Sequence, residues 1–249
     1  MTATTLRRPA FLAALLLALA FAPAARAMEV QRVVSPGGIE AWLVEDHSNP
    51  LIALDVVFRG AGAAADPAEK HGLAEFTSSV IDEGAGPLDS QAFQGELDNL
   101  NIKLSFQAGP DDFSGGLQTL TENRERAFEL LRLALTEPRF DAEPVERIRG
   151  QLLIRAQRNA RNPRDIASRN LNALIYGDHP YSRDVEGATE TLQAITVADM
   201  RQLVERRLGR DNIVVGVAGD TTPAELGPLL DQPFGALPAA SDTPAIPHA

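Results

Sequence analysis

Cysteine is absent from this 249-residue chain, and tyrosine and tryptophan are scarce. Without cysteine the chain can form no disulfide, no thiol nucleophile and no thiolate ligand for a metal. A small disulfide-stapled scaffold is therefore excluded, and the fold must depend on an apolar core. The length is sufficient for one large domain or two small ones.

Basic residues are also in deficit. The chain has 23 Lys and Arg against 34 Asp and Glu, a formal net charge of −11. Such a surface repels nucleic acid and anionic membranes, so we expect no nucleic-acid partner. The acidic residues are scattered along the chain, which favours a solvated exterior. The alternative is that the acidic residues line a binding surface and attract basic peptides to it.

Long apolar runs are missing everywhere except near the N-terminus. Two arginines precede an apolar run over residues 10–22, and small residues follow at Ala25 and Ala27. The run is too short to span a bilayer and leads into a signal-peptidase pattern. We therefore expect residues 1–27 to be a signal peptide cleaved near Ala27. The mature chain is then exported to the periplasm and has no membrane span.

Alternating or apolar β-rich patterns predict strands over residues 29–34, 39–45 and 51–58, with Gly, Pro and Asn turn signals between them. We expect these to be successive antiparallel strands. Two further segments, residues 102–107 and 112–117, predict a hairpin. An apolar run over residues 212–218 predicts a buried strand that returns to the sheet.

Helical periodicity predicts helices over residues 68–82 and 90–99, the second capped by Ser90. Further helices are expected from Thr121 to Pro138, from Asp141 to Asn162, and over residues 165–176 and 197–207. The helix from Asp141 to Asn162 carries its apolar residues in one stripe at Val145, Ile148, Leu152 and Ala156. This order predicts an α+β fold, a mainly antiparallel sheet with helices packed on one face.

Residues 28–237 form one α+β domain in this interpretation. Residues 238–249 are rich in Pro and Ala, which is typical of a linker with no core to join.

The segment Gly60–Ala65, GAGAAA, superficially matches a dinucleotide-binding loop. Pro67 falls where that motif needs an uninterrupted helix, so a glycine-rich packing loop is the better interpretation.

Two other candidate sites, a serine nucleophile and a metal site, are better explained as ordinary parts of a helix. Ser78 and Ser79 lie inside a regular helix rather than on a strained turn, which argues against a serine nucleophile. His71 and Glu75 stand four residues apart and could form a weak two-ligand metal site. Catalytic zinc generally needs three protein ligands, so His71 is better explained as a solvated residue of the first turn.

Five motifs in order resemble one known family: DPAEKHGLAEF, LTENRERAFELL, EPRFDAEPVERIRGQ, GDHPYSR and DNIVVGVAGD. Together they resemble the pitrilysin/insulinase family of inverse-motif zinc metallopeptidases, which includes the mitochondrial processing peptidase subunits. The resemblance covers about residues 29 to 237. It implies the processing-peptidase-like α+β half that is also expected from the patterns above.

Active members of that family carry H-x-x-E-H after the GLA motif, with a third zinc ligand on a later helix. The resemblance places Glu75 at the first His, Ser78 at the general-base Glu, Ser79 at the second His and Ala156 at the third ligand. The four substitutions together imply no catalytic residue, metal or cofactor in this chain.

The resemblance implies a silent subunit whose zinc-bearing sibling cleaves peptides, both enclosing a peptide-binding chamber. The family protomer has two similar halves, so the Pro/Ala-rich tail would begin the linker between them. The family's substrate-positioning Arg/Tyr pair cannot be assigned, because Tyr176 and Tyr181 lie in the wrong half. A stand-alone peptide-binding module and an active peptidase with an atypical site are the alternatives.

Overall fold

A six-stranded sheet forms the centre of the computed structural model, which describes residues 29–247. Its strands run in the order β1-β2-β6-β3-β5-β4. The strands are β1 (Val30–Val34), β2 (Glu40–Glu45), β3 (Leu51–Arg59), β4 (Lys103–Ala108), β5 (Asp112–Leu120) and β6 (Ile213–Gly219). All neighbours pair antiparallel except β2 and β6, which are parallel. The α+β prediction and the mainly antiparallel sheet are confirmed.

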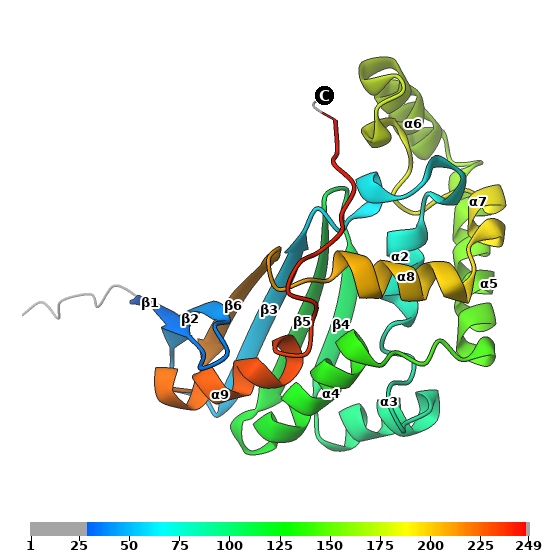
Figure 1. Cartoon of the computed structure of the whole chain (residues 1–249). Coiled ribbons are helices and arrows are strands. Elements are labelled where there is room, and N and C mark those ends of the chain that lie inside the picture. Colours follow the sequence, from blue (N-terminus) through cyan, green and yellow to red (C-terminus); the bar gives the residue numbers. More distant parts are fainter. Residues whose placement is uncertain (1–28, 248–249) are drawn as a thin grey trace, which may run out of the picture.

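Helices gather on one side of this sheet and beyond its β4 edge (Figure 1). The α-helices are α2 (Leu73–Val80), α3 (Ser90–Asn99), α4 (Arg124–Thr136), α5 (Ala142–Asn159), α6 (Pro163–Tyr176), α7 (Thr189–Ala194), α8 (Val197–Arg207) and α9 (Pro223–Phe234). Short 3₁₀ turns are η1 (Ala63–Ala65), η2 (Ala68–Lys70), η3 (Thr121–Asn123) and η4 (Pro180–Ser182).

Strand β3 shows how the sheet separates its two faces. Every second residue, including Leu54, Val56 and Phe58, is buried in the core, because successive side chains point to opposite faces. Along β1 and β2 the other face exposes Val30, Val34 and Trp42, whose exposed fractions are 57%, 51% and 47%. The core therefore lies between the sheet and the helices.

Strand β6 corrects one expectation about pairing. It lies between β2 and β3, so the prediction of successive antiparallel strands holds for β1 and β2 but is wrong for β2 and β3. Alternation within a strand shows which face is buried and carries no information on which strand lies beside it.

Helix α2 begins later than predicted. Residues 68–70 form the separate turn η2, and Gly72 has a left-handed backbone with φ of 94°. A side chain at Gly72 would meet the backbone of Gly187, whose Cα lies 2.7 Å from the position of a Cβ. The chain therefore breaks at Gly72 before α2 starts, because glycine alone accepts this conformation and this close approach.

Other local predictions also need correction. Asp89, and not Ser90, caps α3, since its side chain accepts from the amide of Ala92 at 2.9 Å. No helix was predicted where α9 lies, because Pro228 and Pro233 inside it argue against a helix in the sequence. Its Thr222 N-cap holds the free amides of the first turn, and its apolar face joins the core.

The glycine-rich loop is fixed by a buried ion pair. Arg207 on α8 contacts Asp66 at 2.7 Å, and the two side chains are 8% and 0% exposed. Arg207 also donates to the carbonyl of Ala65 at 3.0 Å, while the second oxygen of Asp66 accepts from the amide of Ala74 at 3.1 Å. The loop thus has a packing role, as expected, and the pair ties it to both α2 and α8.

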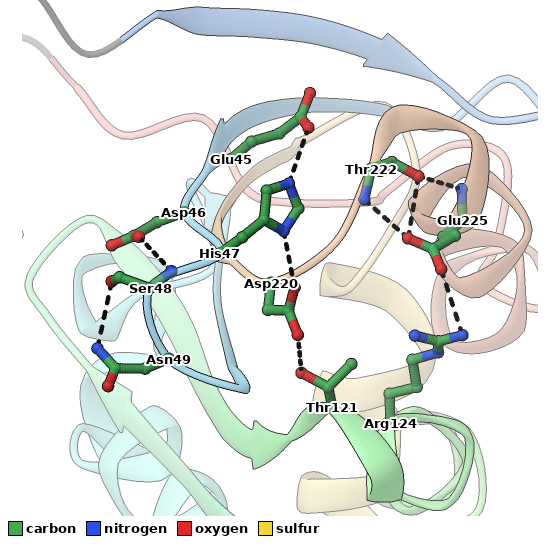
Figure 2. A network of polar contacts seen from close by, with 10 residues as sticks. All are labelled: Glu45, Asp46, His47, Ser48, Asn49, Thr121, Arg124, Asp220, Thr222 and Glu225. Atoms are coloured by element: carbon green, nitrogen blue, oxygen red, sulfur yellow. Dashed lines mark hydrogen bonds and ion pairs between the residues drawn. The ribbon is translucent and has the colours of Figure 1, made fainter. Parts of the chain in front are cut away.

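A second polar network closes the turn end of the sheet (Figure 2). His47 contacts Asp220 through Nδ1 at 2.7 Å and Glu45 through Nε2 at 3.4 Å. Asp220 also accepts from the hydroxyl of Thr121 at 2.9 Å. The network joins the β2–β3 turn to the end of β6 and the start of η3. The hydrogen bond to Asp220 raises the pKa of His47 above its usual 6.5, and Glu45 adds to the effect.

The C-terminal tail follows the domain surface. Leu237, the last residue of the expected domain, is buried in the core. Beyond it the amide of Asp242 donates to the carbonyl of Arg206 at 2.6 Å, and the carbonyl of Pro247 lies 2.8 Å from His179. The expected signal peptide lies outside the described residues. Within residues 29–247 no helix is long and apolar enough to cross a membrane.

Removing the cation of the buried pair should be costly. Arg207→Leu is expected to lower the free energy of unfolding by about 3 kcal/mol, because it leaves Asp66 buried without its countercharge. Urea denaturation measures this. The adjacent Arg206 forms an exposed pair with Asp242, so Arg206→Leu is a matched control that should change stability by about 0.5 kcal/mol or less. A loss below about 1 kcal/mol in Arg207→Leu would contradict the assignment.

The His47 network predicts a pH dependence of stability. A raised folded-state pKa means that the protonated imidazole stabilises the fold below pH 6.5 and that this contribution disappears as pH rises through the folded-state pKa. Urea denaturation at a series of pH values should show the decline in the wild type and its flattening in His47→Gln and in Asp220→Asn. An undiminished decline in His47→Gln would show that another group is responsible.

Candidate functional site

Helices α2 and α5 pack side by side and run in opposite directions. At one end Arg155 of α5 contacts Glu75 of α2 at 2.6 Å, and at the other Arg147 contacts Glu83 at 2.7 Å. Between these ends the guanidinium of Arg149 lies 4.8 Å from the ring centroid of Phe76. The first turn of α2 therefore faces the last turns of α5, where Ala156 lies.

The carboxylate of Glu75 forms an ion pair with Arg155. Its Oε1 accepts from Arg155, which is also 3.4 Å from Glu186, and Asn159 donates to Glu186 at 2.8 Å. The Glu75 and Arg155 side chains are 17% and 35% exposed, so the pair is partly screened by water. A carboxylate held in this way is an ion-pair partner, and α2 and α5 are connected through it to the loop that carries Glu186.

Ser78 and Ser79 bond to their own helix. Both hydroxyls donate to the carbonyl of Glu75, at 2.8 and 3.0 Å. The nearest candidate base in the sequence, His71, has its Nδ1 3.0 Å from the carbonyl of Ala68. A hydroxyl that donates to a helix carbonyl is a local backbone contact and not an activated nucleophile.

Ala156 lies in the buried stripe of α5 and is 8% exposed. Its methyl group offers no electron pair to a metal. Within the part of the chain that the structure describes, no group of three or more His, Asp or Glu side chains is placed to hold a metal ion. His71 and Glu75 in particular engage different partners, so the structure does not bring them to one centre.

A cleft that the sequence predictions did not anticipate lies beside this helix pair. It has a volume of about 550 Å³ and is bordered by α6, the η4 loop and the β4–β5 turn. Tyr176 and Tyr181 both line it, with their ring centroids 5.6 Å apart in an edge-to-face arrangement. The sequence alone assigned neither tyrosine a role. Glu186 also lines the cleft and thus connects it to Arg155. The grouping of both tyrosines around the segment GDHPYSR was a sequence signal for this cleft.

A family model identifies the class to which this α+β domain belongs. Residues 42–189 match the family model described as Insulinase (Peptidase family M16). The match covers more than half of the chain, and the chain therefore belongs to that family. The resemblance inferred from the five motifs is confirmed.

Several known proteins are similar to this chain. The non-peptidase homolog YmxG of Helicobacter pylori is 25% identical over 71% of this chain and 40% of its own length. A probable mitochondrial-processing peptidase subunit beta of Schizosaccharomyces pombe is 25% identical over 80% of this chain and 43% of its own length. The chain spans less than half the length of these two relatives.

Solved structures agree with the fold. The peptidase M16 inactive domain from Pseudomonas fluorescens superposes with a TM-score of 0.81 at 26% identity, covering 88% of this chain and 53% of that one. The first half of the periplasmic protease PqqL from Escherichia coli has a TM-score of 0.75 at 16% identity, covering 90% and 50% of the two chains. At that identity the second structure supports the fold alone.

Proposed function

We propose that this chain is a catalytically silent family member that acts as the partner subunit of a zinc-bearing sibling and completes its peptide-binding chamber. The observation that carries the proposal is the chemistry of Glu75, Ser78, Ser79 and Ala156, the residues that the motif resemblance places at the family's zinc and general-base positions. The sibling supplies the zinc, and this chain supplies a wall of the chamber.

Zinc does not fit the side chains at these four positions. A catalytic zinc needs three protein ligands and an open position for water. Here the one carboxylate, Glu75, is engaged by Arg155 at 2.6 Å, and a guanidinium so close opposes a dication. The two serine hydroxyls donate to the carbonyl of Glu75, and Ala156 has no ligating atom. No catalytic step through zinc follows for this chain.

The family relatives support silence as a property of such domains. One similar protein is described as a non-peptidase homolog and another as an inactive domain, and the latter has the TM-score of 0.81. The matched region is about half the length of these similar proteins. This supports a role in which the domain works beside further domains of the same family.

An exposed apolar area supports the partner role. Val30 and Val34 of β1 and Trp42 of β2 are about half exposed on the sheet face that points away from the core. Grouped apolar exposure of this kind is typical of surfaces that another protein covers. Export to the periplasm is part of the proposal, supported by the signal peptide expected over residues 1–27.

Restoring the family's residues tests the assignment of the four positions. The quadruple variant Glu75→His, Ser78→Glu, Ser79→His, Ala156→Glu should bind about one zinc per chain, since it recreates two imidazoles and a carboxylate. The wild type should bind less than about a tenth of that amount. Metal analysis of dialysed protein measures both, with circular dichroism to verify the fold.

The matched control is the triple variant that leaves Ala156 unchanged, which should bind zinc more weakly because one ligand is missing. A folded quadruple variant with no more zinc than the wild type would show that these are not the metal positions. Stoichiometric zinc with chelator-sensitive peptidase activity in the wild type would overturn the proposal of silence.

A further inference from the structure

Helix α6 buries none of its 14 residues. A helix of this length is marginal in water by itself and normally gains its stability by packing an apolar face. Here the apolar side chains of Leu171, Leu174 and Ile175 are 55%, 85% and 61% exposed. Figure 1 shows that α6 stands apart from the sheet. The domain therefore leaves the apolar side of α6 uncovered.

These three side chains lie on one side of the helix. Residues three and four apart in a helix are neighbours, so Leu174 and Ile175 lie beside Leu171. The cleft between α6 and η4 is lined by other residues of the helix, among them Asp165 and Arg169. The apolar side is therefore separate from the cleft and is open to another molecule.

Opposite charges lie at the two ends of this apolar side. Arg164 is in the first turn of α6, seven residues before Leu171 and on the same side of the helix. Asp178 follows the end of the helix, seven residues after Leu171. Both residues are exposed, and neither has an ion-pair partner within residues 29–247. The surface is thus basic at one end, apolar in the middle and acidic at the other end.

A surface with this order of charges is complementary to itself. When two copies of α6 pack antiparallel about a twofold axis beside Leu171, positions equally distant from Leu171 face each other. Arg164 of each copy then faces Asp178 of the other, and the apolar side chains pack between these two ion pairs. A parallel arrangement would place each charge beside its own counterpart, which is repulsive. Charge complementarity therefore selects a second copy of the chain in the antiparallel arrangement.

We propose that this chain forms a symmetric dimer through α6, with the two helices packed antiparallel about Leu171. The contact is a single helix pair and is smaller than a standard interface of about 1,600 Å². The dimer is therefore weak, with a Kd of about 10–100 μM. The inference goes beyond the proposed function, because the dimer needs neither zinc nor a sibling subunit. Its surface also lies far from the exposed residues of β1 and β2 (Figure 1).

Sedimentation equilibrium of the purified chain, at about 5 to 500 μM, measures the dimer. Arg164→Asp and Asp178→Arg should each weaken it about tenfold, because each variant places like charges at both ends of the contact. The double variant Arg164→Asp, Asp178→Arg should return the affinity to within about threefold of the wild type. Lys103→Asp, an equal change of charge at an exposed residue of β4, should alter it by about twofold or less.

Disulfide cross-linking tests the position of the twofold axis. The chain contains no cysteine, so Leu171→Cys introduces a single thiol that can form a disulfide only with another chain. Mild oxidation should link most Leu171→Cys chains into dimers, because the axis brings the two thiols together. The control is Ile166→Cys, at an exposed position on another side of α6, which should stay monomeric under the same conditions.

A chain that stays monomeric at about 500 μM would overturn the proposal. A dimer that the two single charge variants leave unchanged, or that the double variant does not restore, would overturn it as well. Equal linking of the two cysteine variants would show that the helices do not meet at Leu171. A dimer that passes these tests while the chain has no effect on a sibling would retain this inference and refute only the partner role.

Discussion

The ion pair between Asp66 and Arg207 is the constraint on which the start of α2 and the wall of the cleft depend. Asp66 contacts three separate parts of the fold: Arg207 of α8, the amide of Ala74 in the first turn of α2, and Arg183 in the loop after η4. A buried charge pair has little net stability to offer over apolar packing, but it penalises every arrangement that separates the two charges. Asp66 therefore sets where α2 begins and where the wall of the cleft lies.

The domain has the fold of the family, and the polar side chains of α2 and α5 bond to one another and to their own backbone. Glu75 and Arg155 form an ion pair, and the serine hydroxyls bond within α2. Such contacts hold two helices together and satisfy polar groups that would otherwise be buried without partners. These contacts hold α2 against α5.

The sequence predicted those parts of the fold that follow from local pattern. The β4–β5 hairpin, the buried strand β6 and the stripe of α5 that contains Leu152 and Ala156 all follow from apolar periodicity. The place of β6 between β2 and β3 could not be predicted in this way, because pairing joins segments far apart in the chain. The break at Gly72 depends on the approach of Gly187, which is also a tertiary contact.

The candidate site, like the fold, has parts that local sequence pattern predicts and parts that depend on tertiary contacts. Motif order identified the family, whereas the partner of Glu75 and the cleft lined by Tyr176 and Tyr181 required coordinates. The assignment of Glu75, Ser78, Ser79 and Ala156 to the family's zinc and general-base positions stays a prediction. The most direct test of the partner role is peptide hydrolysis by a family member with intact H-x-x-E-H from the same organism, measured with increasing amounts of this chain. We predict that kcat/KM rises and saturates at one chain per zinc subunit. A rate that stays unchanged at every ratio would contradict the partner role.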